Sequence, residues 1–410
     1  MEQALIEKYA RLVVWVGVHL QKGQTLVISS PIECAPFTRS IVHEAYAAGA
    51  KNVVVNWEDE RTEQLKFLEA PDEIFREFPE WQKQFYHEYL QMGAAFLKIA
   101  APDPDLMKDV DPHRLGVYYH VMAGALAEYQ QRLSGNLNAW SVAAVPTKKW
   151  AQKVFPDCTE AEAVEKLWQA IAACVRLDAD DPVAAWEDHI AALKQHTAYL
   201  NQQHFRQLRY RNAAGTDLTV DLPENHVWCS GREQLPDGTC FLPNIPTEEI
   251  FTLPKKTGVN GVVYGSKPMT VKGSGVVENF CLTFKDGKII DFTARKGLDT
   301  LRELIASDEG SRYLGEAALV PFDSPIAKSG ILFWNTLFDE NAACHLAIGN
   351  ALEFCLAGSG DMTAEQMEEQ GFNHSVIHQD FMIGTRDLEI TGIKADGQEI
   401  PLMRQGNLAF

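Results

Sequence analysis

The chain has 410 residues, of which 46% are hydrophobic and 23% are charged, as in ordinary globular proteins. This length allows two or three domains with substantial cores. The formal net charge is −19, from 37 basic and 56 acidic residues, and no basic run occurs. We therefore expect no nucleic-acid partner, because binding nucleic acid depends on neutralising phosphates with Lys and Arg.

The start of the chain shows no basic segment followed by an apolar one, so we expect no signal peptide. No apolar run reaches the length of a membrane span, and the eight cysteines contain no CxxC pair. These features predict a reduced cytoplasmic protein that has no disulfides and does not enter a membrane.

The first half of the chain alternates helical and strand patterns. Apolar residues recur at helical spacing from Leu5 to Leu20, which predicts a first helix. Strands are then expected at 25–29, 51–57, 94–99 and 140–145. Helices are expected between and after them, at 36–48, 81–92, 112–133 and 182–205. This order predicts an open α/β domain with a parallel sheet over residues 1–205. The domain has no GxGxxG or phosphate-loop motif, so the sequence does not predict nucleotide binding.

The pattern changes in residues 206–410. Polar and apolar residues alternate at 218–222, as in a half-buried strand, and a short helix is expected at 298–306. Asp286-Gly287 and Asp396-Gly397 are each typical of a β-hairpin turn. The expected fold class is thus α/β plus α+β: an N-terminal parallel-sheet domain (1–205), then a mostly antiparallel α+β domain (206–410).

Carboxylates and imidazoles recur in this second half. His378 and Asp380 are two residues apart on a strand predicted at 375–383, so their side chains point to the same face. An imidazole and a carboxylate on one face suit a divalent metal ion, although this pair also occurs by chance on surface strands.

Other candidate ligands are weak when taken singly. Glu340 and His345 have a spacing that does not align two side chains on one helix face, which predicts a loop carrying Glu340 and then a helix start presenting His345. Glu316 lies just ahead of an apolar strand, where burying a carboxylate is costly unless it is paired or metal-bound. Glu248 and Glu249 would by themselves suit a solvated helix start. His345 could instead be a core histidine that binds no metal, and Glu316 could be a surface carboxylate. Only the candidate ligands taken together indicate a metal site.

Four motifs carry a family resemblance. They occur in the order Asn244–Thr252, Leu314–Glu316, Asp339–Gly349 and His378–Asp380. Together they resemble the thermophilic-aminopeptidase family, which comprises aminopeptidases T, S and II and consists of metal-dependent exopeptidases. The resemblance extends over essentially the whole chain.

The resemblance implies that residues 206–410 form the catalytic, metal-binding domain. It also implies a two-metal site whose ions are Zn, Co, Mn or Mg. Carried over residue by residue, the implied metal ligands, with Glu316 as the bridge, are Glu249, Glu316, Glu340, His345, His378 and Asp380. Glu249 is preferred to Glu248 because its separation from Glu316 fits the family spacing better. Glu248 is then the expected catalytic base, taking a proton from a water activated by the two ions. The expected partners are peptide substrates with a free N-terminus and a second copy of the chain, in a homodimer whose N-terminal domain helps to cover the site.

One position departs from the family pattern. The family carries a tyrosine shortly after the metal-binding histidine, where a phenol could stabilise the oxyanion, and here that position is Leu352. His374 is the nearest other polar candidate, although a loop histidine is the simpler interpretation. This departure leaves open two alternatives, a metal-dependent amidohydrolase acting on non-peptide amides and an inactive dimeric family member.

Overall fold

The computed structural model describes residues 3–271 and 275–410. Its contacts divide the chain into two compact units, each assembled from several stretches. The first unit comprises Met1–Ile190, Gly231–Thr247 and Leu332–Leu337, and the second comprises Ala191–Ser230, Glu248–Ile331 and Phe338–Phe410. The single domain boundary near residue 205 stays a prediction.

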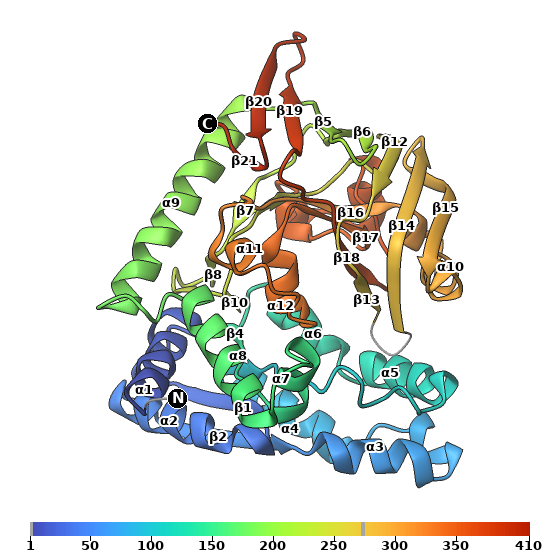
Figure 1. Ribbon diagram of the computed structural model, residues 1–410. Coiled ribbons are helices and arrows are strands. Elements are labelled where there is room, and N and C mark those ends of the chain that lie inside the picture. Colours follow the sequence, from blue (N-terminus) through green and yellow to red (C-terminus); the bar gives the residue numbers. More distant parts are fainter. Residues whose placement is uncertain (1–2, 272–274) are drawn as a thin grey trace. The chain divides into compact units, whose positions relative to one another are not determined.

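The first unit is built on a five-stranded parallel sheet, shown with its helices in Figure 1. The strand order is β10-β4-β3-β1-β2, and the strands are β1 Thr25–Pro31, β2 Asn52–Glu58, β3 Ala95–Ile99, β4 Trp140–Ala143 and β10 Asn244–Ile245. Every adjacent pair is parallel. The predicted α/β character of this part of the chain is therefore confirmed.

Helices connect these strands. They are α1 Gln3–Leu12, α2 Ala35–Ala47, α3 Glu60–Glu69, α4 Glu80–Gln91, α5 Pro112–Ala125, α6 Ala127–Ser134, α7 Lys148–Val154 and α8 Glu160–Cys174. The region predicted as one helix at 112–133 is thus two helices, and α3, α7 and α8 were not predicted. Helices α9, Pro182–Gln203, and α12, Thr336–Asp339, cross the division between the units.

The second unit contains an antiparallel sheet that we call the site sheet. Its strand order is β18-β17-β16-β11-β7, with bounds β7 Cys229–Ser230, β11 Ile250–Thr252, β16 Leu314–Leu319, β17 His345–Gly349 and β18 His378–Met382. All four of its strand pairs are antiparallel.

A larger antiparallel sheet completes the second unit. Its strands are β5 Gln207–Arg211, β6 Asp217–Asp221, β12 Val259–Tyr264, β13 Met269–Val271, β14 Gly275–Lys285, β15 Lys288–Lys296, β19 Glu389–Ile393, β20 Glu399–Arg404 and β21 Asn407–Leu408. Leu346 and Phe381 of the site sheet share one buried core with Leu218 and Leu282 of the larger sheet. The short helices are α10 Leu298–Ile305, α11 Pro325–Ser329 and α13 Ala364–Glu369. The predicted antiparallel character is confirmed.

Two local expectations about the site were wrong. His345 begins strand β17 rather than a helix, and Glu340 begins a short 3-10 helix, Glu340–Ala342. Glu316 lies inside strand β16 rather than ahead of it. Residues 345–349 are all buried, and a short apolar run of this kind does not distinguish a helix from a strand.

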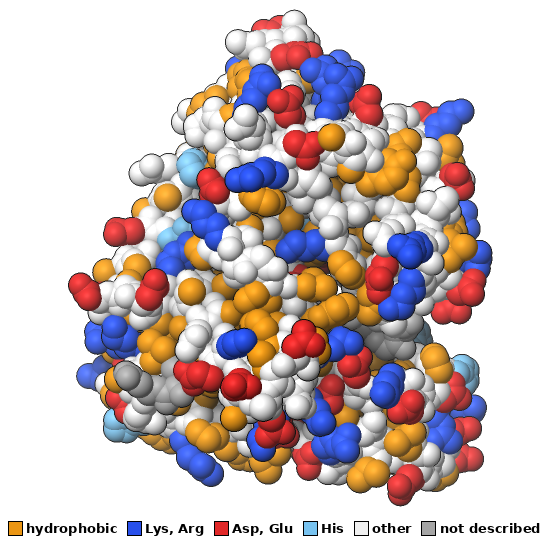
Figure 2. Space-filling model, in the orientation of Figure 1, with side chains coloured by type: hydrophobic (Ala, Val, Ile, Leu, Met, Phe, Trp, Pro, Cys, Tyr) orange, Lys and Arg blue, Asp and Glu red, His pale blue; other side chains and the backbone are white. Residues whose placement is uncertain are grey.

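Charged side chains of both signs are interspersed over the face shown in Figure 2, with small groups of hydrophobic side chains between them. Among the residues described, no helix is both long and apolar enough to cross a membrane.

The two predicted Asp-Gly hairpins form, with glycine in the left-handed region at both turns. Gly287 has φ +83° and Gly397 has φ +85°. An added Cβ at Gly287 would lie 1.7 Å from the carbonyl oxygen of Lys256. At Gly397, no atom of the described residues other than the glycine and its chain neighbours would lie within 4 Å of it. The two turns thus share a backbone conformation but differ in the space around it.

We predict that Gly287→Ala is clearly more destabilising than Gly397→Ala. Gly397→Ala carries only the left-handed backbone cost of about 1–2 kcal/mol. Gly287→Ala adds a backbone clash, for a total of roughly 2–5 kcal/mol. Urea unfolding of both variants measures the difference, and equal losses of stability would contradict the close packing at Gly287.

Candidate metal centre

Alternation along the strands of the site sheet separates a core face from a polar face. On β17, Leu346 and Ile348 belong to the buried core, so His345 and Ala347 point to the opposite face. On β18, Phe381 belongs to the same core, which places His378 and Asp380 on the opposite face.

The register of the strands brings the polar side chains together. Glu316 of β16 lies opposite Ala347, and Ala347 lies opposite Asp380 on the next strand. His345 lies opposite Ala318 in the same way. Alanine between the polar residues leaves space above the sheet that larger side chains would fill.

Glu316 lies between the two histidines. Its Oε1 is 3.4 Å from Nε2 of His345, and its Oε2 is 3.3 Å from Nε2 of His378. Glu249 Oε2 is 3.3 Å from the same His345 nitrogen, and Asp380 Oδ1 is 3.5 Å from that of His378. Two groups of possible ligands result, Glu249–Glu316–His345 and Glu316–His378–Asp380, and they share Glu316.

Backbone carbonyls orient both imidazoles. Nδ1 of His345 is 3.2 Å from the carbonyl oxygen of Ala343, and Nδ1 of His378 is 2.7 Å from that of Asn350. Because a carbonyl oxygen can only accept, Nδ1 carries the proton in each ring and Nε2 faces the carboxylates. This is the arrangement that metal-binding histidines normally show.

The electrostatics favour charge on Glu316 and on both histidines. Burial opposes ionisation of Glu316, but hydrogen bonds from His345 and His378 outweigh it and lower its pKa to about 2. Burial also opposes charge on His345, yet its contacts with Glu249 and Glu316 raise the pKa of the ring well above its usual value. The pKa of His378 is likewise raised well above its usual value, against burial, by Asp380 and Glu316.

The pKa values of two further carboxylates are raised. Burial raises the pKa of Glu249, with Glu316 and Asp380 adding to the effect. Burial, followed by the charge of Glu249 and then of Asp380, raises the pKa of Glu340 well above its usual value. Glu340 is thus electrostatically coupled to the cluster, although it belongs to neither of the two groups. Carboxylates held together in this way need a cation to remain ionised.

Glu248 is buried, at 4% exposure, in the segment without regular secondary structure that leads into β11. Its backbone N–H donates to Oδ1 of Asn341 at 2.7 Å. Asn341 is itself fully buried, and its Nδ2 donates to Oε1 of Glu340 at 3.4 Å. The sequence analysis missed Asn341, although its place directly after Glu340 inside the motif was the available signal.

Three nearby side chains, those of His374, Leu352 and Cys344, are held by contacts with residues outside the two ligand groups. Nε2 of His374 is 3.2 Å from the carbonyl oxygen of Ala364, and its ring lies 4.6 Å from that of Phe372. Leu352 packs against an apolar cluster that includes Phe251. Cys344 is buried in the core, and its Sγ donates to the carbonyl oxygen of Val320 at 3.3 Å.

The donor set fits a divalent ion of the borderline or hard type. Imidazole nitrogens and carboxylate oxygens are the ligands that Zn²⁺, Co²⁺ and Mn²⁺ use in proteins. A divalent ion held by such donors could polarise a carbonyl group and activate a water molecule, as in metal-dependent hydrolases.

The comparison with protein families identifies the family. The thermophilic metalloprotease (M29) family matches residues 2–408. The chain belongs to this family of metallopeptidases, which are hydrolases, and the predicted family resemblance is confirmed.

Individual relatives match over nearly their whole length. The chain is 47% identical over 405 residues to aminopeptidase 2 of Geobacillus stearothermophilus, covering 99% of this chain and 98% of that protein. It is 46% identical over 405 residues to aminopeptidase AmpS of Bacillus subtilis, with the same coverage. The solved structure of wild-type AmpT from Thermus thermophilus aligns with a TM-score of 0.94 at 37% identity, covering 100% of both chains.

We predict that metal binding strengthens as the pH rises and releases protons. In the metal-free protein, His345 and His378 have raised pKa values and so hold protons that an ion must displace. Raising the pH towards those values removes the competing protons, so the apparent affinity should increase between about pH 6 and 8. Calorimetric titration in buffers of different ionisation enthalpy measures both effects. A pH-independent affinity without proton release would contradict this account.

Proposed function

We propose that this protein is an aminopeptidase that removes N-terminal residues from peptides with two divalent ions bound at the site sheet. The observation that carries the proposal is the position of Glu316, whose two carboxylate oxygens each face a different imidazole within 3.4 Å. Such a carboxylate is suited to bridge two ions. The names of the relatives, all aminopeptidases, support the same activity.

The two groups of donors would each hold one ion. Glu249 and His345 would complete one site around Glu316, and His378 and Asp380 would complete the other. Glu340, whose pKa is raised by burial and by its carboxylate neighbours, would ionise in the presence of the ions and complete the ligand set. Nitrogen and oxygen donors of this kind accommodate Zn, Co, Mn or Mg.

The bound ions would supply Lewis-acid polarisation of the scissile carbonyl and a lowered pKa for the attacking water. Glu248 would take the proton from this water and deliver it to the leaving amine, since a general base need only lie within hydrogen-bond reach of the proton it abstracts. The bond between its backbone N–H and Asn341 fixes the start of β11, and thereby the positions of both Glu248 and Glu249.

The proposed metal site suits a substrate with a free amine. An unprotonated α-amine is a nitrogen donor of the kind that the divalent ions would accept. Phe251 lies on β11, two residues after Glu249, and it belongs to the apolar cluster against which Leu352 packs. This cluster would contact an apolar substrate side chain. The homodimer implied by the family resemblance belongs to the same proposal.

We predict that chelated protein hydrolyses leucyl and arginyl anilides only after Co²⁺ or Zn²⁺ is added back. Acetylating the substrate amine should abolish hydrolysis, because the free N-terminus is required. Glu316→Ala is the control, since loss of the shared carboxylate should abolish activity while leaving the fold intact by circular dichroism. Hydrolysis of acetylated substrates would instead favour an amidohydrolase. Tight metal binding without any turnover would favour an inactive family member and make Leu352 the residue to replace with Tyr.

We predict that Glu248→Gln and Glu249→Gln fail in different ways. Glu248→Gln should lower kcat by about 10²–10⁴-fold, with metal affinity nearly unchanged, because only the proton acceptor is lost. Glu249→Gln should weaken the binding of at least one ion by more than about 10-fold. Metal titration and steady-state kinetics of the two variants separate the roles. The reverse pattern would exchange the assignments of base and ligand.

A further inference from the structure

The segment Asn373–Ile377 leads directly into the metal-ligand candidate His378. It has neither helical nor strand structure, and the side chain of Val376 is 80% exposed. Backbone hydrogen bonds hold the segment only at its two ends, where Asn373 and Ile377 accept from the N–H groups of Ala351 and Asn350. Side-chain hydrogen bonds hold the residues between these ends.

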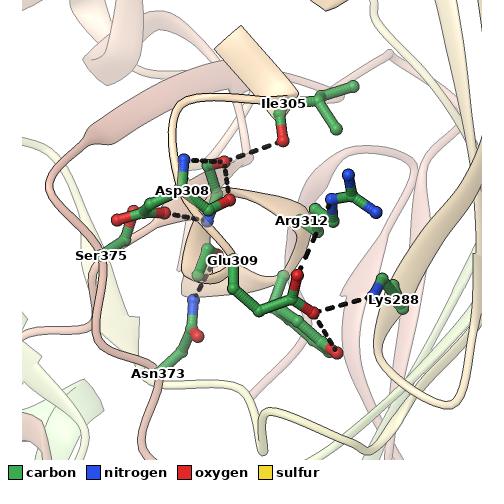
Figure 3. A network of polar contacts seen from close by, with 10 residues as sticks. Lys288, Ile305, Asp308, Glu309, Arg312, Asn373 and Ser375 are labelled. Carbon is green, nitrogen blue, oxygen red and sulfur yellow. Dashed lines mark hydrogen bonds and ion pairs between the residues drawn. The ribbon is translucent and has the colours of Figure 1, made fainter.

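Asp308 holds the segment from the loop after helix α10. Its Oδ2 accepts from the backbone N–H of Val376 at 2.6 Å, and its Oδ1 accepts from Oγ of Ser375 at 2.8 Å. Oδ1 also accepts from the N–H of Ser311 at 2.7 Å, which fixes the carboxylate within its own loop. Figure 3 shows the side chain of Asp308 pointing to Ser375, whereas that of the next residue, Glu309, points to Arg312 and Lys288.

These contacts continue to the imidazole of His378 through Asn350. The N–H of Ser375 donates to Oδ1 of Asn350 at 3.2 Å, and the carbonyl oxygen of Asn350 accepts from Nδ1 of His378 at 2.7 Å. The N–H of Asn350 donates to the carbonyl oxygen of Ile377 at 2.7 Å. A continuous path of hydrogen bonds thus runs from Asp308 through Ser375 and Asn350 to the ring that faces Glu316.

A buried amide fastens the same loop a second time. Nδ2 of Asn373 donates to the carbonyl oxygens of Gly310 at 2.8 Å and of Gly349 at 2.7 Å, and Asn373 is fully buried. The loop of Asp308, the end of β17 and the segment before β18 are therefore tied together. Figure 3 shows Asn373 beside the loop of Asp308.

The ionisation of Asp308 agrees with this role. Burial alone would raise its pKa, but hydrogen bonds from Val376, Ser375 and Ser311 outweigh burial, and the pKa lies below its usual value. Asp308 is thus an ionised acceptor, which makes these hydrogen bonds stronger than bonds between neutral groups.

We propose that Asp308 is a positioning residue that orients His378, and that it sets the metal affinity of the Glu316–His378–Asp380 group without controlling the Glu249–Glu316–His345 group. The selectivity follows from the separate support of His345, whose Nδ1 bonds to the carbonyl oxygen of Ala343. This inference rests on the proposed function, because it assumes that both groups bind metal.

The experiment is a calorimetric titration of the chelated full-length protein with Zn²⁺ and, separately, with Co²⁺. In Asp308→Ala, one of the two binding steps should weaken by about 10–100-fold, as is usual when the support of a metal-binding histidine is lost. The other step should keep its wild-type affinity. His378→Ala should remove the step that Asp308→Ala weakens, which identifies the affected site.

Glu309→Gln is the matched control. Glu309 is the next residue in the same loop, and its carboxylate contacts Lys288 at 2.7 Å, Tyr313 at 3.5 Å and Arg312 at 4.0 Å. Removing its charge tests any general electrostatic effect of a carboxylate in this loop, and both binding steps should keep their wild-type affinities.

Two further variants grade the effect. Asp308→Asn keeps one acceptor oxygen and should give an intermediate loss of metal affinity. Ser375→Ala, which removes the hydrogen bond to Asp308 and the one that the hydroxyl accepts from the N–H of Ile377, should weaken the same step. It replaces Asp308→Ala if that variant does not fold.

The outcomes separate this inference from the proposed function. Equal weakening of both steps, or wild-type binding in Asp308→Ala and Ser375→Ala, would overturn the positioning role. Since the readout is metal binding, selective weakening upholds that role even if the wild-type protein cleaves no peptide, an outcome that would reject the proposed function alone. A wild-type protein that binds neither ion would overturn both.

Discussion

The candidate metal centre depends on one electrostatic constraint, the burial of a carboxylate between two imidazoles. Glu316 is 5% exposed and lies in the middle of an otherwise apolar strand. An isolated carboxylate cannot stay ionised there, because water is excluded and other carboxylates lie close by. His345 and His378 provide the compensating charge in the metal-free protein, and divalent ions would provide it in the active enzyme. The alanines of the site sheet leave space for these side chains, and the hydrogen bonds to Nδ1 point both rings at Glu316.

The two histidines differ in how they are supported, although both present Nε2 to Glu316. The partner of His345 is the carbonyl oxygen of Ala343, two residues earlier in the same segment. The partner of His378 is the carbonyl oxygen of Asn350, which belongs to a different part of the chain. The hydrogen bond of His345 needs only one folded segment of the chain. That of His378 needs β18, Asn350 and the segment that holds Asn350 to come together. The two halves of the candidate metal centre are thus unequal in how much of the fold each one needs.

Sequence reasoning succeeded where a local rule fixes the structure. Asp286-Gly287 and Asp396-Gly397 predicted their hairpins because the turns require positive φ, and the two-residue spacing of His378 and Asp380 placed both on one face of β18. It failed where a local pattern is ambiguous or a partner is distant. His345 was assigned to a helix, since a short buried run has no period that separates the two structures. Helix α8 was missed although Thr159 and Glu162 form a capping box at its start. The register that brings Glu316 opposite Ala347 and close to Asp380 is set by three strands from distant parts of the chain, so no single segment contains it.

The direction of the Cys344 side chain has a chemical consequence for the neighbouring histidine. Cys344 precedes His345 directly, but it points into the core, and burial raises the pKa of its thiol to about 11. A thiol in this state is a poor ligand and a poor nucleophile. Within the described residues, the two ligand groups therefore offer nitrogen and oxygen donors only, so thiophilic ions such as Cd²⁺ or Cu⁺ gain no advantage there. Oxidation of Cys344 would accordingly leave the donor atoms of both groups in place.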